Sequence, residues 1–331
     1  MVKTQGADAV GPTKGRAAGT PKIDLLKVGK SKRLAKLNKD YLDLLSIVEK
    51  SRHGFAVEQA SLKSKPAKDA AEQLLRQLDL IFHMVQLPYV ILMTMLGYAT
   101  GFEDAFKLVL HRLVSHRTTP NLEDRKRKYE KQAKSAMQHF FAIDVSGSLS
   151  RPWLFAVTVY IWTAFECLAG DLWAISLNHA TTLGHRTLTS IVSEDTEDSS
   201  LSRRHIDVGL AARYGFDLRR SLGTILRPKF DFSSFEGVMV AYKKAFGTCG
   251  ELENFSDVLK ELEQLRHLIV HRGGVADSKF VKITKLKVRA DKIVSLKLSQ
   301  VGLYMMSVTL GCVALLKVVD EWFVSQKETL Q

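Results

Sequence analysis

The chain has 331 residues, which is enough to bury a large hydrophobic core in one large domain or two ordinary ones. Apolar residues make up 46% and charged residues 25%, and this balance excludes a wholly disordered chain. The formal net charge is +13 and the three cysteines are far apart, so we expect no disulfide framework or cysteine zinc site, and a reducing, cytoplasmic location.

The chain begins with a segment, residues 1–22, that we expect to be a flexible basic arm. Residues 1–39 hold ten Lys or Arg against two Asp, so this stretch carries +8 of the +13. The first 20 residues contain no apolar run, and we expect no secretory signal. A basic arm attracts phosphate backbones without reading sequence, and a solvated tail that aids solubility has the same composition.

The next part, residues 23–143, is expected to be a helical region of unknown role. Helical spacing of apolar residues predicts helices over 34–50, 68–97, 102–114 and about 121–141, with a polar loop over 51–66. The last of these helices carries a second basic cluster, which we expect to be mainly a solvated face. The small, polar segment 144–150 predicts a domain boundary.

Three apolar runs raise the question of a membrane, and two of them, 152–165 and 301–316, are too short to cross a bilayer. Residues 80–102 contain no Asp, Glu, Lys or Arg and are long enough to cross a bilayer. The run is interrupted by His83 and Pro88, and buried helices of a large bundle have the same composition. We therefore expect this run to be buried, with His83 as a core histidine. A membrane-associated helical protein is the third alternative.

The second half, residues 150–327, is expected to form a helical domain of its own. Helices are predicted over 150–177, 205–226, 234–246, 255–271 and 301–323, with a short hairpin-like insert over 277–298. The helix over 255–271 has the clearest apolar face in the chain. Asn254 and Asp257 predict a capping box at its start, and Gly273–Gly274 predict its end.

The residues that carry chemistry lie at the end of that helix, where Arg266, His267 and His271 occur within six positions. Arginine offers a permanently charged fork that matches phosphate. Histidine takes and gives protons near neutral pH. Arg266 and His271 are about 140° apart around the helix, so they share one pocket only at the helix edge or in a relaxed last turn. The pair fits cleavage of RNA by its own 2′-hydroxyl, with no metal or cofactor needed.

This pattern of an arginine, a polar residue, three variable positions and a histidine resembles the signature of the HEPN superfamily (higher eukaryotes and prokaryotes nucleotide-binding). In this chain the pattern is followed by Gly273–Gly274 and a long closing helix. The aromatic stretch Trp162–Glu166 is also similar to HEPN-like proteins of bacterial defence loci. The resemblance covers about residues 150–325. It implies an up-and-down helical bundle, a homodimer with a composite cleft, Arg266 and His271 as catalytic residues and His267 as a supporting or substrate-binding residue.

Several alternatives compete with that interpretation. Arg266 has Glu263 three residues earlier as a possible partner, and a histidine at a helix C-terminus is favoured by the dipole whatever it does. His267 and His271 have the spacing of two zinc ligands, but no third ligand is evident and no metal is expected. Glu166, among apolar neighbours, fits either a buried acid near the cleft or a core group with a backbone or arginine partner.

The sequence therefore predicts an all-α protein whose C-terminal bundle is a metal-independent ribonuclease of HEPN type. The expected partners are RNA, a second copy of the chain and, in a toxin–antitoxin or phage-defence setting, an antitoxin or defence-complex subunit. The alternative is a catalytically inactive HEPN-like dimerisation or interaction module.

Overall fold

The computed structural model describes residues 32–87, 150–194, 208–215, 217–284, 286 and 288–329. The described part is mostly helical and has no strand, which confirms the all-α prediction. Four predicted features lie outside the described residues: the basic arm, the basic cluster near residue 125, residues 144–149 of the boundary segment and most of the apolar run 80–102.

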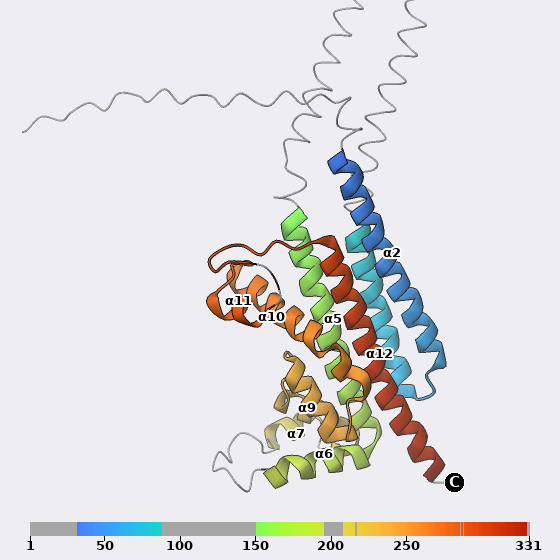
Figure 1. Ribbon diagram of the computed structural model, residues 1–331. Helices are drawn as coiled ribbons and strands as arrows, with labels where there is room; N and C mark the ends of the chain where they lie inside the picture. The colour runs from blue at the N-terminus through green and yellow to red at the C-terminus, as the bar shows by residue number, and fades with distance from the viewer. Residues whose placement is uncertain are drawn as a thin grey trace, which may run out of the picture.

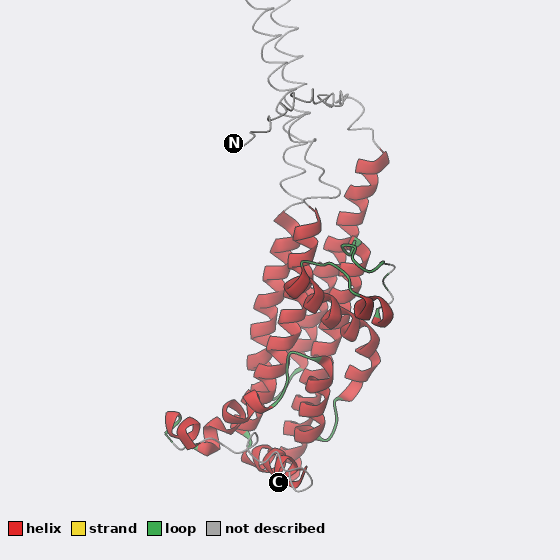
Figure 2. Ribbon diagram, turned by 90° about the vertical axis from the view of Figure 1, so that its left-hand side faces the viewer, coloured by secondary structure: helices red, strands yellow, loops and turns green. Residues whose placement is uncertain are grey.

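Four long helices form an elongated bundle (Figures 1 and 2). They are α2 (Lys32–Ser61), a helix over residues 65–87, α5 (Ser150–His179) and α12 (Leu298–Thr329). Helix α12 packs against both α2 and α5. The indole Nε1 of Trp153 on α5 donates to the backbone oxygen of Met84 at 2.8 Å and so joins α5 to the helix over 65–87.

Helices α5 and α12 are apolar around most of their circumference, and this is why they lie at the centre of the bundle. Each is long and apolar enough to cross a membrane, yet most residues of both stretches are buried against other helices. A core helix of a helical bundle meets the same criteria of length and composition, so these two helices are weak evidence for a membrane protein.

Shorter elements cover one side and one end of the bundle. They are α6 (Thr181–Glu194), α7 (Val208–Arg213), α8 (Leu218–Leu226), α9 (Phe235–Phe246), α10 (Ser256–Arg272) and α11 (Ser278–Ile283), with short 3-10 helices η2 (Arg227–Lys229) and η3 (Gly250–Phe255). Helix α10 packs against both α5 and α12, and α11 lies beside α10 (Figure 1). Helix α10 carries Arg266, His267 and His271, which we call the motif, and it is therefore the motif helix. It is supported by the two most buried helices, α5 and α12.

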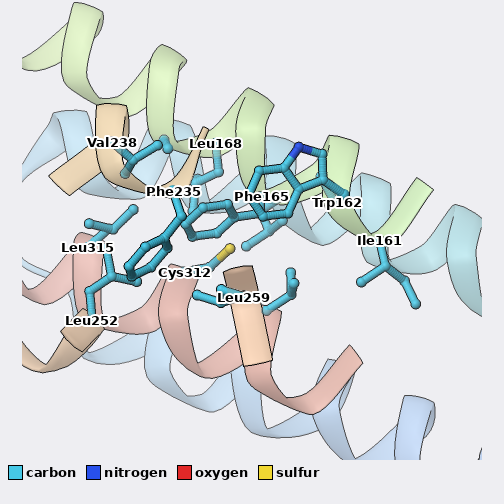
Figure 3. Packing of buried hydrophobic residues seen from close by; sticks show 14 of the residues in the cluster. Ile161, Trp162, Phe165, Leu168, Phe235, Val238, Leu252, Leu259, Cys312 and Leu315 are labelled. Carbon is cyan, nitrogen blue, oxygen red and sulfur yellow. The ribbon is translucent and has the colours of Figure 1, made fainter. Parts of the chain in front are cut away.

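All the described α-helices except α7 contribute side chains to one continuous hydrophobic core. Figure 3 shows side chains from several helices meeting in it, including Phe165 of α5, Phe235 of α9, Leu259 of α10 and Cys312 of α12. The same core includes Leu44 of α2 and further residues of the helix over 65–87. Residues on both sides of the predicted boundary at 144–150 therefore stabilise the same bundle.

Helix α2 is longer than predicted, because the expected polar loop over 51–66 is mostly helical. Phe55 and Leu62 are buried and continue the apolar face, and Gly54 lies on the exposed side. The polar composition of this stretch belongs to the outward face of a half-buried helix. The prediction of a buried His83 is also wrong, since its side chain is exposed on the helix over 65–87.

Three local predictions in the second half were wrong. The helix expected over 205–226 is divided into α7 and α8 near Gly215, whose φ is +61°. The expected capping box does not form, because η3 runs directly into α10 and Phe255 has no capping side chain. The hairpin is replaced by α11 and one antiparallel bridge between Val275 and Ile293. Of its alternating apolar residues, Val294 and Leu296 are buried in the common core, whereas Ile283 of α11 is exposed.

Asp320 of α12 caps the start of the helix over 65–87. Its carboxylate accepts hydrogen bonds from the backbone N–H of Lys63 at 2.9 Å and of Ser64 at 2.5 Å. Replacing Asp320 by alanine leaves these two amides without an acceptor, and we expect a loss of about 1–2 kcal/mol in the free energy of unfolding. Urea denaturation measures this loss. Asp320→Asn keeps an acceptor oxygen and is expected to lose less; equal stability of all three proteins would contradict the cap.

Candidate functional site

The candidate site is built on α10. Leu259, Leu262, Leu265 and Leu268 are buried and fix the rotation of this helix against the bundle. This rotation puts Arg266 on the flank of the apolar face and His267 and His271 on the solvent side. The prediction of a helix over 255–271 with one apolar face is therefore confirmed.

Helix α10 ends at the predicted pair of glycines. Gly273 has a φ of +58° and donates to the oxygen of Ile269 at 3.1 Å, and Gly274 donates to the oxygen of Leu268 at 3.2 Å. This is the double hydrogen bond that closes many helices with a left-handed residue. A Cβ on Gly274 would lie 2.4 Å from the ring of Phe155, so glycine is required there for close packing on α5.

Arg266 of α10 faces Glu166 of α5. The guanidinium Nη2 lies 3.7 Å from the carboxylate Oε2, and each side chain is 27% exposed. At this distance the two groups form an ion pair but are too far apart for a hydrogen bond. Glu166 therefore has the arginine partner that the sequence allowed, and that partner is the motif arginine itself.

The guanidinium keeps unused hydrogen-bond capacity. Its Nε is buried and has no acceptor within the described residues, and the buried Nε1 of Trp162, one turn before Glu166 on α5, has none either. A buried donor without an acceptor costs about 1–3 kcal/mol. An anion in solvent would meet only the exposed part of this side chain, because the Nε itself is shielded from solvent.

Glu263, the other candidate partner of Arg266, is used elsewhere. Its carboxylate accepts the backbone N–H of Phe235 at 2.9 Å and so caps the start of α9. Burial raises the pKa of this carboxyl above its ordinary value. The contact holds α9 against α10. Because Glu263 is engaged there, Arg266 pairs with Glu166 instead.

The two motif histidines lie together on the exposed side of α10. The ring centroids of His267 and His271 are 4.5 Å apart, and both side chains are exposed. The structure thus pairs Arg266 with Glu166 of α5 and places His267 beside His271. Arg266 and the two histidines lie on adjoining sides of α10. Within the described residues, no cluster of three His, Cys, Asp or Glu side chains is placed to hold a metal ion.

The segment after α10 is tied to the end of the motif. Asp277 caps α11 by accepting the backbone N–H of Phe280 at 2.7 Å, and it pairs with Arg272 at 2.7 Å. The hydrogen bond from Phe280, with Arg272 beside it, holds the pKa of the Asp277 carboxyl below its usual value. The sequence pattern predicts only a hairpin-like insert here, and no local pattern indicates its attachment to the end of α10.

Comparisons with family models, curated proteins and solved structures find no match to this chain. The residues at the end of α10 and their geometry are therefore the observations that bear on function.

Proposed function

We propose that the chain is a metal-independent RNA endonuclease of HEPN type. One observation carries the proposal: the Arg266 guanidinium is held at the flank of α10 by Glu166 and its side chain is 27% exposed, while His271 near the end of the same helix is exposed. A positioned cation can stabilise the charge that develops at the phosphorus during attack by a 2′-hydroxyl, and an accessible imidazole can transfer a proton in the same reaction.

The proposed reaction is an internal displacement at phosphorus. The 2′-oxygen forms a bond to the phosphorus as the bond to the 5′-oxygen breaks. The imidazole of one His271 takes the proton of the 2′-hydroxyl, and an imidazolium returns a proton to the departing 5′-oxygen. Arg266 stabilises the charge that develops on the non-bridging oxygens. The products are a 2′,3′-cyclic phosphate and a 5′-hydroxyl.

The resemblance to HEPN proteins suggests that two copies form the working site. One chain offers one Arg266 and one His271, whereas the reaction uses a base on one side of the phosphorus and an acid on the other. A two-fold dimer with both α10 helices at its seam would supply two exposed imidazoles. In this proposal the enzyme acts in the cytoplasm, in a toxin–antitoxin or phage-defence system, with an antitoxin or defence-complex subunit as its regulator.

Incubation of the purified chain with total cellular RNA in a chelator tests the proposed function. We expect the wild type to cut the RNA, because no step uses a divalent cation. His271→Ala is expected to lower the rate by about 10²–10⁴-fold, the usual contribution of a positioned acid or base. The control is His179→Ala, which removes an exposed histidine at the end of α5. RNA that stays intact with the wild type would contradict the proposal.

A second candidate function is an inactive interaction module. Leu303, Met306 and Leu310 of α12 are 43–46% exposed and share one face at helical spacing. An exposed apolar row of this kind suits a partner helix. If both the wild type and His271→Ala leave RNA intact, and Met306→Glu dissociates a complex, this second function is supported in place of the first.

A further inference from the structure

A strongly basic segment follows the motif and has no role in the chemistry above. Residues 278–297, the basic insert, contain seven Lys or Arg and one Asp, and their net charge of 7 − 1 = +6 is almost half of the +13 of the chain. Five of the seven basic side chains lie in the described part, and all five are exposed: Lys279, Lys282, Arg289, Lys292 and Lys297.

The basic insert is fixed to the end of α10 by its backbone. The N–H of Ala276 donates to the oxygen of Lys292 at 2.9 Å, and the N–H of Val294 donates to the oxygen of Gly274 at 2.9 Å. Phe280 and Leu296 are buried and anchor the insert on the core. Figure 1 shows α11 beside α10 and the following segment returning toward the start of α12. The charges are therefore held next to the last turn of the motif helix.

We propose that the basic insert is a phosphate-binding arm that makes an extended single-stranded RNA the substrate of this site, in preference to a dinucleotide. The inference rests on the proposed function, because it assigns the substrate class of the same motif. Lysine and arginine bind successive phosphates without reading bases, and each contact releases counterions from the RNA.

The composition of the surface favours RNA over an acidic protein. Five exposed side chains of the described insert are lysine or arginine, against one aspartate, Asp291. Ile283 and Ile293 are its exposed large apolar side chains, and the remaining exposed residues are small. Interfaces between proteins are depleted of lysine at their centres and are organised around buried aromatic and aliphatic anchors. Phosphates spaced along a flexible strand fit separate exposed cations, because each contact needs no pocket.

The experiment compares the wild type with Lys279→Gln/Lys282→Gln/Arg289→Gln/Lys292→Gln. The binding probe is a 2′-O-methyl RNA of about twelve nucleotides, which has no free 2′-hydroxyl to attack. Each lost phosphate contact lowers the slope of log K against log salt by about 0.7, so we expect the fourfold variant to lose up to about 2.8. Its affinity at about 0.1 M salt is expected to fall at least about tenfold, and cleavage of a dinucleotide is expected to be unchanged.

A matched variant controls for total charge. Lys63→Gln/Lys65→Gln/Lys68→Gln/Arg76→Gln removes four exposed charges at and after the start of the helix over 65–87, which begins at the other end of the bundle (Figure 1). We expect this variant to bind the probe like the wild type. Circular dichroism melting checks that both variants fold.

The outcomes separate the two proposals. If the wild type binds the probe through the insert but cuts no RNA, the phosphate-binding arm is supported and the nuclease is not. If the wild type cuts RNA and the insert variant has an unchanged affinity and salt slope, the arm is overturned and the nuclease stands. Equal competition by poly-glutamate of matched charge would overturn RNA as the occupant, as would failure of the wild type to bind the probe.

Discussion

Replacing Arg266 by alanine is expected to lower the rate of RNA cleavage by about 10²–10³-fold while the bundle still folds. The guanidinium is the only group of the proposed site that is both permanently charged and seated against the core. Arg266→Lys keeps the charge but loses the planar fork, and we expect it to recover only part of the activity. Single-turnover cleavage of a labelled oligonucleotide measures both rates.

The partner carboxylate supplies the matched control for this experiment. Glu166→Gln keeps the shape of the side chain and removes the charge that holds Arg266 at 3.7 Å. We expect a smaller loss than for Arg266→Ala, since Glu166 positions the arginine and does not touch the RNA. In the double variant the two losses should not add, because both act through one guanidinium. Wild-type rates for Arg266→Ala would exclude this arginine from the chemistry.

The largest expected effect on stability is at Trp173 of α5. This side chain is completely buried. The centroid of its ring system lies 4.8 Å from that of Phe230 and 5.5 Å from that of Phe232. Its Nε1 donates to the backbone oxygen of Ala241 at 3.0 Å. Trp173→Ala removes the packing and the donor together, and we expect a loss of about 3–5 kcal/mol in the free energy of unfolding.

Urea denaturation followed by far-UV circular dichroism measures that loss. Trp322→Ala is the matched control, because Trp322 is only partly buried near the end of α12. We expect this control to lose clearly less stability than Trp173→Ala. Equal losses for the two variants would mean that the contact of α5 with α9 and its neighbours is not a main source of the stability of the bundle.

The sequence was sufficient to predict the all-α class and the motif helix. Both predictions used periodicity over more than ten residues, which is the strongest local signal in a sequence. The leucines of α10 and the glycines after it determine the face and the end of this helix, and the structure agrees at each of them. The chemistry of Arg266 and His271 is predicted from residue type alone.

The wrong or missing predictions concern features that depend on contacts with residues far away in the sequence. The stretch after residue 50 is polar because one face of α2 is solvated, and only the neighbouring helices determine which face that is. The alternation over 281–298 predicted strands, but the described residues of the insert form α11 and a single isolated bridge instead. The pairing of Glu166 with Arg266 joins residues 100 positions apart, which no local pattern predicts.

The chemical nature of the cut ends tests the central claim most directly. Attack by the 2′-hydroxyl, assisted by Arg266 and His271, predicts a 2′,3′-cyclic phosphate on one fragment and a 5′-hydroxyl on the other, formed in the presence of a chelator. Mass spectrometry of a cleaved oligonucleotide distinguishes these ends. Fragments with a 3′-hydroxyl and a 5′-phosphate would contradict the account, because they require water as the nucleophile.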